Sequence, residues 1–305
     1  MGQKHQIGGQ AVIEGIMMRG PKSLAVAVRR ADGRIATKIS ALSSWGDRWS
    51  VFKLPFFRGL AALVEALSLG VKTLLYSANE SGAEEEEISE REMGLTVAVA
   101  FLIAVGLFMV LPVYLTRFLQ TAIPHNAALN GIEFAIRMSL FVLYIVVISR
   151  ADDVKRLFAY HGAEHKAVHA YEAGLDLTPE NVQKQSTLHP RCGTSFILIV
   201  FMVSMLFFVW IGYDNFLIRV LSRLLLLPLI AGVSYEIVRL AGKSRSSLLR
   251  IFCLPGLALQ KLTTREPDQG QIEVAVEALQ AVLRKESPAR ETDHPPKEEG
   301  SVHHA

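Results

Sequence analysis

The sequence predicts a mainly α-helical, multi-pass membrane protein with about four transmembrane helices and a small N-terminal β-containing segment on the cytoplasmic side. Three observations support this fold class. Half of the residues are hydrophobic and the mean hydropathy is +0.30, which is high for a soluble domain. The apolar residues gather in runs long enough to cross a hydrocarbon core of roughly 30 Å. The chain before these runs alternates polar and apolar residues as β-strands do.

The segment before the first apolar run, residues 1–92, is expected to form a cytoplasmic unit. Ser23 to Val28 and Arg34 to Ile39 alternate like two strands, and Ala31, Asp32 and Gly33 between them favour a hairpin turn. The preceding stretch, GGQAVIEGIMMRGP, is expected to lie against this hairpin as a strand or loop.

The same segment continues with a helical pattern. Between Phe56 and Asn79 apolar residues recur every three or four positions, which predicts a helix that lies in a core or on the membrane surface. The acidic run from Glu84 to Glu87 is predicted to be a solvated linker.

Four apolar runs are predicted to span the membrane, two within residues 93–149 and two within residues 196–242. They are Thr96 to Leu115, Ile132 to Ser149, Phe196 to Gly212 and Phe216 to Leu240. The first and third contain no charged residue. The second and fourth contain several, and we expect those near the ends of a span to reach the lipid headgroups. They are Glu133, Arg137, Arg219, Arg223, Glu236 and Arg239.

The distribution of Lys and Arg predicts the orientation. These residues are dense before the first span, between the second and third, and after the fourth. By the positive-inside rule, both termini and the central loop, residues 150–195, are cytoplasmic, in a bacterial plasma (inner) membrane. The first twenty residues lack the apolar core of a signal peptide. The net charge of +3 then reflects orientation and contact with the lipid bilayer, and no nucleic-acid partner is expected.

Residues 243–285 are expected to form two helices outside the spans. Ser247 to Leu262 is predicted to lie at the membrane interface with a break near Pro255 and Gly256, and Pro267 to Arg284 to be a soluble amphipathic helix. The tail, residues 286–305, is predicted to be disordered because of its Pro, Glu and Lys content.

A histidine-rich stretch in the central loop, YHGAEHKAVHAYE, carries the main functional signal. On a helix, His161, His165, His169 and Glu172 fall within an arc of about 80°, with Glu164 to one side and three alanines almost opposite. HGAEH matches the inverted zinc-hydrolase pattern H-x-x-E-H, in which two histidines four apart bind a metal and the glutamate acts as a base towards water.

A second cluster in the same loop, HPRCGTSF, strengthens the metal hypothesis. His189 and Cys192 have a spacing seen in metal sites, and the proline and glycine beside them favour a turn back towards the helix. Other interpretations stay open at this point. The histidines are compatible with headgroup contact, His189 and Cys192 with a closed structural metal site, and Cys192 with a thiol nucleophile that uses His189 as base.

Three residues outside the loop are second-tier candidates. Glu14 and Arg19 flank EGIMMRG, where a turn with its own salt bridge is the simpler interpretation. Glu236 lies deep in the last predicted span, and an ionisable residue in a membrane helix is a functional candidate by default.

Four motifs in register, IGGQAVIEGIMMRGP, YHGAEHKAVHAYE, HPRCGTSF and TTREPDQGQIEVAVEAL, resemble the bacterial YqhQ-like membrane proteins, from about Ile7 to about Leu283. That family is of unknown function and is catalogued as predicted metal-dependent enzymes. The resemblance implies a metal and a membrane location, and it implies that the N-terminal and C-terminal motifs form one functional unit with the histidine motif. It implies no substrate.

These patterns together favour a metal-dependent membrane hydrolase. A divalent metal, expected to be zinc, would bind His161 and His165, with Glu164 as general base and with His169, Glu172, His189 or Cys192 completing the ligands. The substrate would be a peptide, ester or phosphoester that reaches the cytoplasmic leaflet. The alternatives are a transporter or channel with a His/Glu gate and Glu236 in its pathway, and a scaffold with a structural metal. A homo-oligomer is compatible with each.

Overall fold

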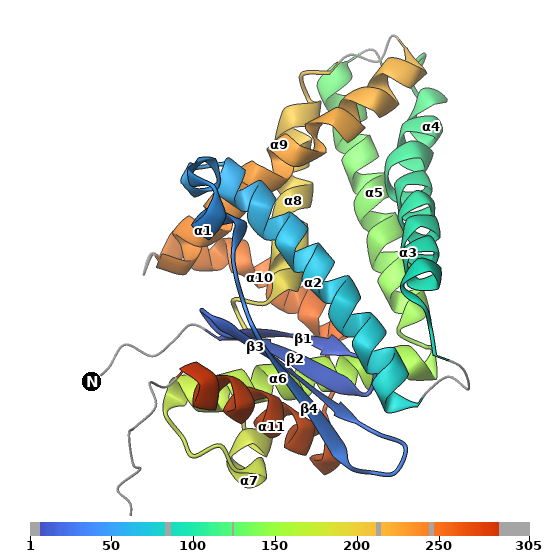
Figure 1. The fold of residues 1–305 in the computed structure, drawn as a ribbon. Helices are drawn as coiled ribbons and strands as arrows, with labels where there is room; N and C mark the ends of the chain where they lie inside the picture. Colours follow the sequence, from blue (N-terminus) through green and yellow to red (C-terminus); the bar gives the residue numbers. More distant parts are fainter. Residues whose placement is uncertain (1–6, 83–86, 124, 212–214, 244–246, 287–305) are drawn as a thin grey trace, which may run out of the picture.

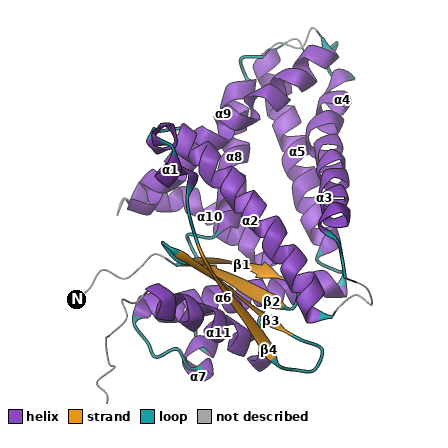
Figure 2. Cartoon of the chain, in the orientation of Figure 1, coloured by secondary structure: helices purple, strands orange, loops and turns teal. Residues whose placement is uncertain are grey.

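The structure is a computed structural model that describes residues 7–82, 87–123, 125–211, 215–243 and 247–286. Within these residues the chain is mainly helical and contains a four-stranded sheet. Long apolar helices occupy one end of the molecule, and the sheet lies with its covering helices at the other end (Figure 1). In Figure 2 the strands stand out as the layer between these helices.

The sheet is an antiparallel meander with strand order β1-β2-β3-β4. Its strands are β1 (Gly8–Val12), β2 (Gly15–Arg19), β3 (Ser23–Arg29) and β4 (Ile35–Ala41). The predicted hairpin is confirmed as β3 and β4. The glycine-rich stretch before it forms two strands, joined by a tight turn of two residues.

The two faces of the sheet pack against different helices because side chains alternate along each strand. In β2, Ile16 and Met18 pack with α6 (Asp152–Ala173) and α11 (Gln269–Glu286), whereas Met17 faces α2 (Phe57–Ser81). The predicted amphipathic helix near the C-terminus is therefore confirmed, as α11. The N-terminal sheet, the histidine helix and the C-terminal helix form one packed unit.

The other helices follow the predicted order. They are α1 (Trp45–Arg48), η1 (Ser50–Lys53), α3 (Glu90–Val105), η2 (Gly106–Val110), α4 (Leu111–Arg117), α5 (Asn126–Ile148), α7 (Pro179–Gln183), α8 (Gly193–Phe208), α9 (Phe216–Lys243) and α10 (Ser247–Thr263). The segments α3, η2 and α4 continue one another, and η2 is a short stretch of π-helix within that long helix.

Four helices of the described chain are long and apolar enough to cross a membrane, which agrees with the predicted number but only partly with the predicted members. They are Phe57–Ser81, Glu90–Arg117, Asn126–Ile148 and Phe216–Leu240. The predicted third span corresponds to α8, which is apolar but has only 16 residues. Helix α2 meets the criterion, although its Leu69 and Tyr76 pack on the sheet.

A buried ionic cluster joins α5 to α9. The carboxylate of Glu133 accepts hydrogen bonds from Arg137 at 2.6 Å, from Arg223 at 2.8 Å and from Arg219. The side chains of these residues are at most 5% exposed. The expectation that charges near the ends of spans reach the headgroups is therefore wrong for these four residues, because they neutralise one another inside the bundle instead.

The predicted break near Pro255 and Gly256 is also wrong, since α10 continues through both residues. Gly256 lies directly against Ser195 of α8, where a Cβ atom would overlap the serine side chain. This close packing outweighs the single backbone hydrogen bond that a proline cannot donate. Residues 84–86 of the predicted linker and residues 287–305 of the predicted tail lie outside the described residues.

Candidate metal centre

Helix α6 presents the histidines because its opposite face is buried. Ala163, Ala167 and Ala170 are fully buried against the sheet and α11. The predicted helix is confirmed, and it ends at Gly174, whose φ of 76° is the left-handed conformation typical of a helix C-terminus. The imidazoles on the other face are neighbours, with ring centroids of His161 and His165 4.4 Å apart.

The ring of His161 is fixed by the chain that follows α10. Its Nδ1 donates a hydrogen bond to the carbonyl oxygen of Thr263 at 2.8 Å. A carbonyl can only accept, so the proton of the neutral ring is on Nδ1 and the lone pair is on Nε2. That Nε2 atom lies 3.2 Å from the Sγ atom of Cys192.

His165 is held in the same way. Its Nδ1 donates to the carbonyl oxygen of Thr187, which again leaves the lone pair on Nε2. The Nε2 atom is buried and has no hydrogen-bond partner among the described residues, and the nearest acidic oxygen, on Glu164, is 3.5 Å away. A buried lone pair without a partner is unusual in a folded protein. Histidines that bind a metal commonly donate their other ring N–H to a carbonyl in this manner.

Cys192 supplies a third ligand atom. It is the N-cap of α8, and its Sγ accepts a weak hydrogen bond from the backbone N–H of Thr194 at 3.5 Å. The start of a helix favours a thiolate, the form of cysteine that binds metals. The ligand atoms of His161, His165 and Cys192 all lie within 4.8 Å of one another. Two imidazoles and a thiolate suit zinc, and three protein ligands leave a fourth position open.

Glu164 lies beside this group and against β1. Its side chain packs on Gly9, where a Cβ atom would approach the glutamate Cγ to 2.7 Å, and it accepts the N–H of Gly9. Burial raises the pKa of Glu164 to about 7, although nearby His161, the Gly9 N–H and His169 act in the opposite direction. A carboxyl with such a pKa can take up and release a proton near neutral pH.

The other predicted ligands form a second group, in which ligand atoms of His169, Glu172 and His189 lie within 4.8 Å of one another. Here the hydrogen bonds favour a polar network. His189 accepts the N–H of Arg191 on Nδ1 at 3.3 Å, so its Nε2 carries the proton and faces Glu172 at 3.4 Å. Burial, together with His169 and His165, lowers the pKa of His189 to about 4, which keeps the ring neutral. Glu172 also forms an ion pair with Arg191.

Several residues that hold the site were not expected from the sequence. The side chain of Gln260, which is fully buried in α10, accepts the N–H of His189 at 2.8 Å and donates to its carbonyl at 2.9 Å. The segment after α10 crosses α6 at Gly162, where a Cβ atom would overlap the carbonyl oxygen of Arg265. The TTREPD motif gave a signal for this segment, whereas a glutamine in a predicted interfacial helix gave none.

Glu14 and Glu236 are engaged elsewhere. Glu14 lies in the turn between β1 and β2 with φ of 50° and forms an ion pair with Arg156, with Nε and Oε1 2.5 Å apart. Glu236 of α9 accepts a hydrogen bond from Arg58 of α2 at 2.7 Å.

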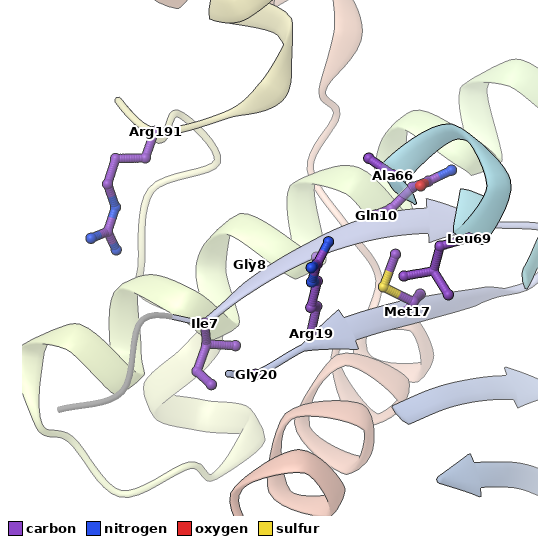
Figure 3. Close-up of a pocket in the computed structure, with 10 residues that line it drawn as sticks. Ile7, Gly8, Gln10, Met17, Arg19, Gly20, Ala66, Leu69 and Arg191 are labelled. Atoms are coloured by element: carbon purple, nitrogen blue, oxygen red, sulfur yellow. The ribbon is translucent and has the colours of Figure 1, made fainter. Parts of the chain in front are cut away.

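Arg19 lies near a cavity that adjoins the candidate metal centre. A cavity of about 560 Å³ is bordered by the three ligands of the first group, by Glu164 and by β1. A second cavity of about 400 Å³ continues along β1 and is lined by both Arg19 and Arg191. In Figure 3, Arg19 rises from β2 into this space, and Arg191 enters on the side away from Ala66 and Leu69 of α2.

Comparison with known proteins places this arrangement in a class. Residues 54–285 match the model of the family described as "Protein of unknown function (DUF1385)", and the chain belongs to that family. A particular relative is the protein named "Uncharacterized protein YqhQ" from Bacillus subtilis (strain 168). It is 37% identical over 311 residues, which cover 96% of this chain and 98% of the relative. The predicted resemblance to YqhQ-like proteins is thus confirmed. No solved structure matches the chain at a significant level.

Proposed function

We propose that this protein is a metal-dependent hydrolase of the bacterial cytoplasmic membrane, with its active site on the cytoplasmic side. Four long apolar helices support a membrane location. The sheet, α6 and α11 gather at one end of these helices (Figure 1), and both termini and the Lys- and Arg-rich segments lead to that end. The positive-inside rule then favours a cytoplasmic position for the site.

The observation that carries the metal proposal is the orientation of two imidazoles. His161 and His165 each donate Nδ1–H to a backbone carbonyl and thereby direct Nε2 towards the same space, where the Nε2 of His165 is buried without a hydrogen-bond partner among the described residues. With the Sγ of Cys192 this gives a donor set that suits zinc.

Glu164 supplies the acid–base chemistry in this proposal. Its carboxylate lies beside His165 and borders the 560 Å³ cavity, so it can accept a proton from an attacking water and pass it to the leaving group. The metal, when bound, would supply Lewis acidity that polarises the bond to be hydrolysed.

Metal content and mutation test the proposal together. Purified wild-type protein is expected to contain about one zinc per chain by element-resolved mass spectrometry. The variants His161→Ala, His165→Ala and Cys192→Ala are expected to lose it. Wild-type protein without stoichiometric metal, or ligand variants with unchanged metal, would contradict the proposal. Glu164→Gln separates an enzyme from a scaffold with a structural metal, because an enzyme keeps the metal and loses its biological activity, whereas a scaffold keeps both.

A thiol hydrolase is a second candidate, favoured by one observation. The 3.2 Å between His161 Nε2 and Cys192 Sγ is a distance suited to a base and its nucleophile, and Cys192 sits at the start of a helix. His161 takes the role that the sequence analysis gave to His189. Rapid alkylation of Cys192 by iodoacetamide in metal-free wild type, and slow alkylation in His161→Ala, would favour this candidate. Protection of the thiol by stoichiometric zinc would favour the metal enzyme.

A further inference from the structure

We propose that the free edge of β1 binds an extended peptide that carries an acidic residue, and that this peptide is the substrate. The inference rests on the proposed function, because it names the substrate class of the same site. It starts from the position of β1, which is an edge strand of the sheet and pairs with β2 alone among the described strands. An edge strand is a template on which another extended chain can add.

The outward backbone groups of β1 can be identified from one hydrogen bond. The N–H of Gly9 is donated to Glu164 and therefore points away from β2. In an antiparallel strand, residues two apart direct their backbone groups to the same side. Ala11 therefore also points its N–H and carbonyl outwards, whereas Gln10 between them pairs with β2.

The space beside this edge has the form of a groove. The 560 Å³ cavity is bordered by residues 7–11, by α2 on one face of the sheet, by α6 on the other face, and by the segment before α8 opposite the strand. A chain that adds to β1 would lie between these walls. It would pass Glu164 and the candidate ligands, so that one of its peptide bonds is beside the reactive groups.

Charge and shape continue the groove beyond the reactive groups. The adjoining 400 Å³ cavity follows the same strand and brings in Arg19 and Arg191 (Figure 3). Each arginine faces one carboxylate, Glu65 at 3.8 Å and Glu172 respectively, and a guanidinium has five donors. An acidic side chain of the peptide would complement these two groups. A Cβ atom at Gly8, which lines both cavities, would meet no atom within 4 Å.

Two variants test the proposal at the strand itself. Ala11→Pro removes an outward N–H and leaves the pairing with β2, as prolines in edge strands do. Ala11→Ser keeps the N–H and is its control. Gly8→Trp fills the groove. Gly131→Trp is its control, because a Cβ at Gly131 of α5 also meets no atom within 4 Å and lies outside both cavities.

The measurement is the fluorescence anisotropy of labelled dephosphorylated β-casein, an unfolded acidic protein, with each full-length variant in nanodiscs. Ala11→Pro is expected to weaken binding roughly two- to tenfold, the effect of one hydrogen bond, and Gly8→Trp to abolish it, with both controls unchanged. Equal binding by all variants, or no binding by wild type, would overturn the proposal. Photoactivatable phosphatidylglycerol that labels β1 in wild type but not in Gly8→Trp would assign the groove to lipid and also overturn it.

Zinc content, measured in the same samples, separates this inference from the proposed function. Binding that depends on β1 in a protein without zinc supports the peptide groove and contradicts the metal enzyme. Stoichiometric zinc in a protein that binds no casein supports the metal site and overturns the peptide groove.

Discussion

His161 and Cys192 meet across the candidate metal centre, with Nε2 and Sγ 3.2 Å apart, although 31 positions separate them in the chain. The contact depends on three separate elements. Helix α6 carries the histidine, the start of α8 carries the cysteine, and the carbonyl of Thr263 after α10 orients the imidazole. A change in any of these elements is therefore expected to alter the site.

His165→Ala should abolish stoichiometric zinc binding, because it removes the buried Nε2 that has no other partner among the described residues. Competition with a chromogenic zinc chelator measures the affinity. His189→Ala is the informative comparison, since His189 belongs to the neighbouring hydrogen-bond network and its loss is expected to weaken zinc only about 10- to 100-fold, as for other residues that support a ligand. An affinity in His165→Ala equal to that of wild type would exclude this ligand.

Gln260→Ala should weaken zinc binding without removing a ligand. The substitution leaves the N–H and the carbonyl of His189 unsatisfied in a buried place and releases the segment that carries Cys192. We expect a loss of about 1–3 kcal/mol in the free energy of unfolding for each group left unsatisfied. Gln280→Ala is the matched control, because that glutamine makes one longer hydrogen bond, of 3.2 Å, to Leu177. Identical zinc affinities in the two variants would argue against a positioning role.

Gly162→Ala should destabilise the cytoplasmic unit. The new methyl group would overlap the carbonyl of Arg265, and a backbone atom cannot give way as a flexible side chain can. The expected cost is about 1–3 kcal/mol, typical of overpacking. Thermal unfolding in detergent measures it. Gly131→Ala, in open space on another helix, should instead be neutral or stabilising, because alanine has the higher helix propensity. A melting temperature of Gly162→Ala at or above that of wild type would contradict the described crossing of α6 by the C-terminal segment.

Glu133→Ala should be among the most destabilising substitutions in the helical part. It removes the carboxylate that Arg137, Arg219 and Arg223 share, and breaking a buried ionic cluster in this way costs about 3–5 kcal/mol. Leu225→Ala, at a side chain that is 78% exposed, is expected to change stability by no more than about 0.5 kcal/mol. Comparable melting temperatures for the two variants in the same detergent would show that the cluster does not hold α5 to α9.

The sequence predicted the parts of the fold that depend on local patterns. Alternation identified β3 and β4, and the helical period placed His161, His165 and His169 on one face of α6 with alanines behind them. The assignment of α8 and α2 to spans was less accurate, because hydropathy does not record that α2 also packs on a sheet. The predicted break in α10 failed because a close contact between helices, at Gly256 and Ser195, leaves no local signature.

The candidate site was predictable in its residues but not in its arrangement. The spacing of the histidines and the nearby HPRCGTSF motif indicated the two clusters. Pairing Cys192 with His161 and not with His189 depends on where the loop returns, which Gln260 and Thr187 determine through backbone contacts. Such contacts involve carbonyl and N–H groups that every residue has, so the sequence carries no mark of them.

The packing of α11 against β2 and β3 also sets an order of events during synthesis. The sheet is complete once β4 has been made, but the helix that covers its inner face is made last, after residues 42–268. Until then Ile16 and Met18 have no partner from α11, and the cytoplasmic unit cannot close before the apolar helices have been placed. Assembly of the histidine site is therefore coupled to completion of the chain, and a truncation before α11 should leave a membrane-inserted protein without a working centre.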